Sequence, residues 1–172
     1  MMEKRRFLIK WFFYIALLWI FAVLQFMVFS RLRIGGTAPN LLPLLVVAVA
    51  VFEGPRGGGV YGFAAGLLLD AFQYPAEGFF TLFLMLGALA ASVLTRRLFR
   101  RSLPIALLLS FLMLVYINLL YFLVFALVTG RAGPMALLTV CLPEILVSMP
   151  ASAVFYLLVR GVHQRWGKTG DE

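Results

Sequence analysis

Long apolar runs, separated by short breaks of charge, glycine and proline, dominate the sequence. The runs extend approximately over 9–30, 38–53, 57–75, 78–95, 103–129 and 134–160. A helix needs about 20 residues to cross the hydrocarbon core of a bilayer, so the second and third runs are short for a span. The pattern predicts six transmembrane helices. The tight linker Glu53-Gly54-Pro55-Arg56-Gly57 joins the second and third into a hairpin that crosses with help from its neighbours or thins the bilayer locally.

The third run carries glycines at helical spacing. At about 100° per residue, Gly59, Gly62, Gly66 and Asp70 fall within a stripe roughly 80° wide on one helix face. Glycine weakens a helix in water by about 1 kcal/mol relative to alanine, but in a membrane it lets two helices approach closely. A charged residue at membrane depth usually faces protein or water. The stripe therefore predicts a buried face that leads to a polar spot, and its counterpart is either another helix of this chain or a helix of a different protein.

Composition places the chain in the membrane. Of its 172 residues 63% are hydrophobic and 13% charged, and the mean hydropathy is +1.01. A soluble domain is nearer half apolar and a quarter charged. We expect an all-α integral membrane protein with a single membrane domain over residues 1–172 and no soluble domain. The first run is longer than the apolar core of a typical signal peptide and no small-residue cleavage site follows it, so we interpret it as a retained helix.

The charges predict an orientation. With the N-terminus inside, six spans leave Arg31, Arg33 and Arg131 outside and the other 12 of the 15 Lys and Arg residues inside. The positive-inside rule then favours cytoplasmic placement of both termini. Because topology accounts for the net charge of +8, a nucleic-acid partner is not required.

Several polar side chains are predicted to gather towards the outer leaflet. Asn118 and Glu144 are each 13 residues from Arg131, on opposite arms of the last hairpin, so they should lie at similar depth. Three more polar residues come near the outer ends of their helices: Gln25, Asn40 and Asp70. An unpaired charge at membrane depth costs about 2.5–3.5 kcal/mol or more. The cluster is therefore either a polar pocket or partner contact that opens outwards, or a set of interhelical hydrogen bonds that only stabilise the fold.

The inner side offers a basic loop and little chemistry. Arg96, Arg97, Arg100 and Arg101 fix topology and touch anionic lipid, or alternatively dock an acidic cytoplasmic partner. The single histidine, His163, falls in the predicted cytoplasmic tail, and no spacing of His, Cys and carboxylates suggests a metal site. We therefore expect no enzyme, no cofactor and no metal, while a transporter or channel role stays open.

Certain motifs also resemble a known family. Three of them lie in the first half of the chain: Pro39-Asn40-Leu41-Leu42, the pattern from Gly59 through Gly62-Phe63 and Gly66-Leu67-Leu68 to Asp70, and Gly78 at the opening of the fourth run. The segment from Glu144 to Pro150 is similar as well. Together with size and order of features, these resemble the MreD family of rod shape-determining membrane proteins over nearly the whole chain. The resemblance implies a fold similar to the S-components of energy-coupling-factor transporters.

The same resemblance implies a non-enzymatic scaffold in the bacterial inner membrane. MreD-like proteins associate with MreC, a single-span protein with a large periplasmic domain. Through MreC they connect cytoplasmic MreB filaments to RodA and a penicillin-binding transpeptidase in cell-wall elongation. From the physics of the sequence we add that the stripe from Gly59 to Asp70, and the outer polar cluster, receive a partner helix or segment.

Two other functions compete with the scaffold. One is a solute-binding subunit of S-component type, which usually presents an Ala-x-x-x-Ala-like face on its first helix; here Ala16 and Ala22 are six apart with bulky residues between them. The other is a lipid-handling subunit, in which Arg31, Arg33 and Arg131 would meet anionic headgroups near the outer leaflet. Saturable binding of a water-soluble vitamin would favour the first of these.

Overall fold

The fold is helical throughout the part of the chain that the computed structural model describes, residues 2–29, 39–72, 78–98, 102–129 and 134–166. The elements in chain order are α1 (Met2–Val23), the π-helix η1 (Leu24–Phe29), α2 (Leu42–Phe72), α3 (Phe79–Leu98), α4 (Leu103–Thr129) and α5 (Pro134–Trp166). Five of these helical stretches are long and apolar enough to cross a membrane. The prediction of an all-helical membrane protein is confirmed.

The predicted count of six separate helices is not confirmed, because the second and third predicted runs form one element, α2. Within α2 only Gly54 departs from helical geometry, with φ 79° and ψ −171°. Only glycine adopts this backbone region readily, because it has no Cβ. Pro55 follows directly, where a helix tolerates proline because the first N–H groups have no partner within the helix. Glu53-Gly54-Pro55 thus ends one helical arm and begins another.

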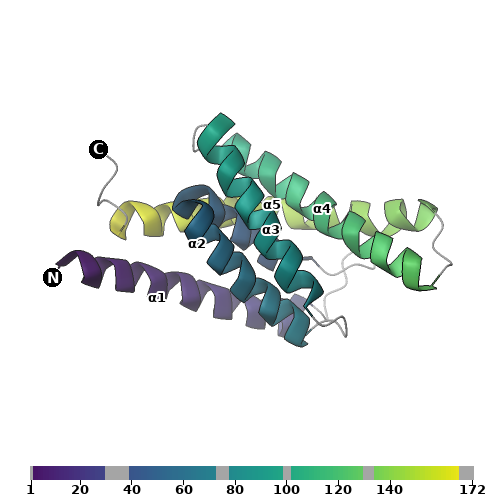
Figure 1. Ribbon diagram of the computed structural model, residues 1–172, viewed down its shortest axis with the longest axis horizontal. Helices are drawn as coiled ribbons and strands as arrows, with labels where there is room; N and C mark the ends of the chain where they lie inside the picture. Colours follow the sequence, from purple (N-terminus) through teal and green to yellow (C-terminus); the bar gives the residue numbers. More distant parts are fainter. Residues whose placement is uncertain (1, 30–38, 73–77, 99–101, 130–133, 167–172) are drawn as a thin grey trace.

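The two arms of α2 fold back on each other. A Cβ placed on Gly58 would lie 2.8 Å from Cα of Ala50, although eight residues of a straight helix would separate the two by about 12 Å. The predicted hairpin is therefore present as a sharp reversal at Gly54 inside α2, visible in blue in Figure 1.

The first arm of α2 forms the centre of the molecule. Every residue from Leu41 to Phe52 is buried. A helix that is apolar on all sides is typical of a protein core or of a membrane span, and here it packs among the remaining helices. Its 12 residues from Leu42 to Glu53 extend about 18 Å, well short of the ~30 Å hydrocarbon core. Both ends of this arm therefore come to lie within the depth of the surrounding bundle.

The other helices enclose this arm. α3 packs along the second arm of α2, while α1 and α5 lie beside each other, with the start of α1 and the end of α5 at the same end of the molecule (Figure 1). At the opposite end η1 meets the end of α2, where the rings of Phe26 and Phe72 are 5.1 Å apart. The cytoplasmic placement of the termini stays a prediction, as does the likeness to an S-component.

Candidate functional site

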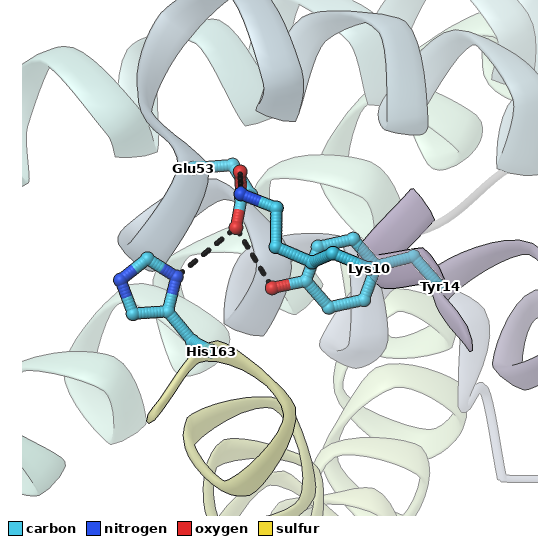
Figure 2. A network of polar contacts seen from close by, with 4 residues as sticks. All are labelled: Lys10, Tyr14, Glu53 and His163. Carbon is cyan, nitrogen blue, oxygen red and sulfur yellow. Dashed lines mark hydrogen bonds and ion pairs between the residues drawn. The ribbon is translucent and has the colours of Figure 1, made fainter. Parts of the chain in front are cut away.

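A buried carboxylate, Glu53, ends the first arm of α2 and collects three partners from two other helices. Its Oε2 lies 2.7 Å from Nζ of Lys10, and its Oε1 accepts a hydrogen bond from the Tyr14 hydroxyl at 2.8 Å. Nδ1 of His163 is 3.1 Å from the same Oε1. Figure 2 shows the side chains converging from α1, α2 and α5. We call Lys10, Tyr14, Glu53 and His163 the Glu53 network.

The Glu53 network is shielded from solvent and tied into the second arm of α2. The side chains of Lys10 and Glu53 are only 11% and 8% exposed. The Tyr61 hydroxyl donates to the backbone carbonyl of Tyr14 at 2.9 Å. The ring of His163 packs on Phe52. Because three donors engage one carboxylate, the arrangement joins the reversal of α2 to the ends of α1 and α5.

Sequence reasoning missed this network. It placed Glu53 in a linker, used Lys10 only for topology and assigned His163 to the cytoplasmic tail, whereas His163 lies within α5. A usable signal was present: Lys10 interrupts an apolar run, and Tyr14 follows it at the i+4 spacing that puts both on one helix face. A cation at such a position calls for an acid, and Glu53 was the obvious candidate on the predicted inner side.

At the opposite end of the buried arm, a second network provides hydrogen-bond acceptors for the backbone N–H groups. The π-turn of η1 carries Gln25, whose Oε1 accepts from the backbone N–H groups of Leu41 and Leu42, both at 2.9 Å. The Gln25 side-chain amide donates to Oδ1 of Asn40 at 3.0 Å. The backbone N–H of Asn40 donates to Oγ of Ser148 at 3.1 Å. The first amides of the arm, which have no partner inside the helix, thereby gain acceptors.

Glu144 and Asn118 complete this network. Glu144 of α5 is hydrogen-bonded to the side chains of Asn118 and Asn40. Asn118 also donates to the carbonyl of Leu114 at 3.1 Å. The structure thus brings together four of the polar residues that the sequence placed towards the outer leaflet. We call Gln25, Asn40, Asn118, Glu144 and Ser148 the Asn40 network; their groups bond mainly to one another and to the start of the buried arm.

The glycine stripe packs against α3 of the same chain. A Cβ on Gly62 would meet the Leu84 carbonyl oxygen at 2.8 Å, and one on Gly66 would meet the Phe80 carbonyl oxygen at 2.6 Å. Gly59 faces the Leu89 side chain. These contacts occupy the face that we expected to receive a partner helix, so its counterpart in this structure is α3.

Asp70, at the end of the stripe, also has its counterpart in α3. Its Oδ1 accepts the N–H of Phe80 at 2.9 Å, and its Oδ2 accepts the N–H and the hydroxyl of Thr81 at 2.8 and 2.5 Å. These are among the first amides of α3, and a negative charge is favoured at a helix N-terminus. Asp70 therefore caps α3 and stands apart from the Asn40 network.

The two described arginines of the basic loop behave differently. The Arg96 guanidinium lies against Gly54, in the space where a side chain at that position would project. Arg97 is exposed at the end of α3. Arg100 and Arg101 lie outside the described residues. Arg96 is exposed as well, but of this described pair it is the one whose guanidinium packs at the reversal of α2.

The described side chains form no cluster of metal ligands. Among them, no group of three or more His, Cys, Asp and Glu lies close enough to hold a metal ion. In both networks the carboxylates are hydrogen-bonded to donors from neighbouring helices. The arrangement supports holding helices together at defined positions.

Comparison with known proteins identifies the family. A family model described as rod shape-determining protein MreD matches residues 5–165, nearly the entire chain. The chain belongs to the MreD family. No curated protein and no solved structure matches it. This MreD-family chain is accordingly a rod shape-determining membrane protein, and the motifs that carried the resemblance now have positions: the Pro39-Asn40 motif starts the buried arm of α2, and the glycine pattern lines its contact with α3.

Proposed function

We propose that this MreD-family protein is a non-enzymatic scaffold subunit of the cell-wall elongation complex in the bacterial cytoplasmic membrane. In this role it binds an MreC-like single-span protein and helps couple MreB filaments to RodA and a penicillin-binding transpeptidase. The observation that carries the proposal is the family match over residues 5–165. Direct contact with MreC is the first step, and the remaining links follow through it.

The internal hydrogen bonding supports a scaffold more than a solute carrier. A solute site needs a cavity with polar groups available to the ligand. In the Asn40 network, Gln25 is bonded to the start of α2, and Glu144 to Asn118 and Asn40. These groups stabilise the bundle, which then offers a fixed membrane surface to a partner.

The partner contact belongs on the surface of this bundle. α3 covers Gly62 and Gly66, so a second helix cannot reach them unless α3 leaves. We therefore place the contact with the MreC-like helix on the apolar surface that the bundle exposes to lipid. Close packing at small residues drives helix association in membranes, so small residues and complementary shape would determine where on this surface the MreC-like helix binds.

Co-purification tests the proposal directly. The chain is co-expressed with a tagged MreC-like protein from the same organism, and the detergent extract is run on size exclusion. We expect one co-eluting peak. A matched control replaces the partner's transmembrane segment with that of an unrelated single-span protein. Separate elution of the two folded proteins would contradict the proposal, and saturable binding of a vitamin by the chain alone would replace it with the S-component function.

A further inference from the structure

An open apolar groove of about 460 Å³ runs between α3 and α4. On α3 it is lined by small residues, among them Gly87 and Ala90, and by Leu94; on α4 its walls include Met113 and Tyr116. At Gly87 the Met113 side chain of α4 already occupies the space where a Cβ would project, so the open part of the groove lies beside this contact, towards Ala90 and Leu94. A groove of this size falls in the range of ligand sites, about 300–1,000 Å³.

The length of the groove decides what can occupy it. On α3 the lining extends from Leu86 to Leu94, which at 1.5 Å per residue is about 12 Å. A transmembrane helix is about 30 Å long and would need a contact surface over several more turns. An acyl chain is narrow and apolar and can enter from the bilayer. The dimensions therefore favour a lipid chain over a partner helix.

Arg97, a cation without an ion-pair partner among the described residues, lies just beyond the end of the groove on α3. Arg97 follows Leu94 by three residues and Ala90 by seven, so it lies on the same face of α3, one turn beyond the end of the groove. It is exposed, and within the described part of the chain no carboxylate forms an ion pair with it. α3 ends at Leu98, so Arg97 is at the level where a helix leaves the bilayer and long basic side chains reach the headgroups.

We propose that this groove is a binding site for one anionic phospholipid. One acyl chain lies between α3 and α4 against Ala90 and Leu94, and the phosphate headgroup meets Arg97. Arg96 does not take part, because its guanidinium lies against Gly54. The bound lipid fills the gap between α3 and α4 and so completes the surface that the bundle offers to the membrane.

Native mass spectrometry of the purified full chain, exchanged into phosphatidylglycerol or phosphatidylcholine, tests the site. We expect the native chain to retain one phosphatidylglycerol in preference to phosphatidylcholine. Arg97→Gln should lower that preference about five-fold, because a basic residue near the headgroups is worth about that factor. Ala90→Trp should fill the groove and remove the retained lipid of either kind.

Two matched variants serve as controls. Arg165→Gln removes another exposed arginine on α5, and Leu82→Trp adds bulk at an exposed position of α3 away from the groove. Both should retain lipid as the native chain does. If Ala90→Trp fails to fold, Ala90→Leu fills part of the groove and should reduce retention.

Two results would overturn the lipid site. The first is that the native chain retains phosphatidylglycerol and phosphatidylcholine equally, and that Arg97→Gln does the same. The second is unchanged retention in the folded Ala90 variant. If that variant instead loses only the MreC-like partner, the groove is a helix-docking site. Because lipid retention is measured on the chain alone, failure here leaves the scaffold proposal standing, and failed co-purification leaves the lipid site standing.

Discussion

Among the described glycines Gly66 lies closest to the backbone of a neighbouring helix, and replacing this residue with alanine tests how the bundle is held together. A Cβ at this position would meet the Phe80 carbonyl oxygen at 2.6 Å, about 0.8 Å closer than the 3.4 Å at which ordinary contact begins. The obstacle is backbone, and it belongs to the turn of α3 that Asp70 caps. Since no side chain can turn away, α2 and α3 must separate along their contact.

The free-energy cost of overpacking is partly offset by the higher helix propensity of alanine. Overpacking a well-packed interior costs about 1–3 kcal/mol, whereas alanine improves helix propensity by about 1 kcal/mol over glycine. We expect Gly66→Ala to lose up to about 2 kcal/mol net. Gly161→Ala is the matched control, because nothing lies within 4 Å of a Cβ there, and it should gain up to about 1 kcal/mol. Gly59→Ala should fall between them, because the obstacle is the Leu89 side chain at 3.0 Å, which can move.

Thermal unfolding in detergent, followed by fluorescence-detected size exclusion, measures the series. For a chain of this length 1 kcal/mol corresponds to about 2–4 °C in melting temperature. The helix-propensity gain is common to both variants, so the overpacking cost of about 1–3 kcal/mol should make Gly66→Ala melt about 2–12 °C below Gly161→Ala. We expect Gly66→Ala to be the least stable variant, Gly59→Ala to be intermediate and Gly161→Ala to be the most stable. Equal melting of the three would refute the packing of this face on α3. Loss of the MreC-like partner without loss of stability would restore the earlier expectation that a partner helix binds here.

Three further substitutions probe the reversal of α2, the Glu53 network and the cap of α3. Gly54→Ala should destabilise the chain by about 1–3 kcal/mol in the same melting assay, because alanine disfavours this backbone geometry and its Cβ would displace Arg96; native-like melting would argue against the reversal. Glu53→Gln should cost about 3 kcal/mol by leaving Lys10 buried without a counter-charge, and Lys10→Met added to it should recover much of the loss; a purely additive double variant would show that the pair is not coupled. Asp70→Ala should cost about 1–2 kcal/mol and speed amide exchange at the start of α3, and unchanged exchange would exclude the cap.

The long apolar runs were enough to predict an all-helical membrane protein. The positions of the polar residues along those runs predicted much of one polar cluster. The glycine spacing located a close-packed face, and counting residues from Arg131 placed Asn118 and Glu144 at one depth, where the structure links them. Neither argument could say which helix the glycine face meets. That depends on how the two arms of the predicted hairpin are placed among the other helices, which the sequence pattern does not specify.

Polar residues near predicted boundaries were harder to interpret. Glu53 adjoins glycine and proline, a context typical of an exposed linker, yet the reversal turns it inwards to Lys10 and His163. Asp70 was grouped with the outer polar cluster because of its position along the helix, but its neighbour in space is the start of α3. In both cases depth along a helix was predictable, while the direction of the side chain depended on tertiary packing.

The short buried arm of α2 explains why polar residues gather at two levels of an otherwise apolar protein. Inside a membrane every backbone polar group needs a partner within the protein, because no water reaches it. A helix that crosses the bilayer ends in water, but an arm of about 18 Å ends inside the bundle. At its start the amides of Leu41 and Leu42 therefore need Gln25. At its end the carbonyl of Ala50 accepts the hydroxyl of Ser92, and Arg96 lies against Gly54.

On this reasoning the two networks are a consequence of ending a helix at membrane depth. Their positions follow from the length of the arm, and a ligand is not needed to account for them. The groove between α3 and α4 differs from the two networks, because it lies between helices and not at a helix end, and its lining is almost wholly apolar. Substitutions in the networks should therefore change the stability of the isolated chain, whereas substitutions in the groove should change what the folded chain binds.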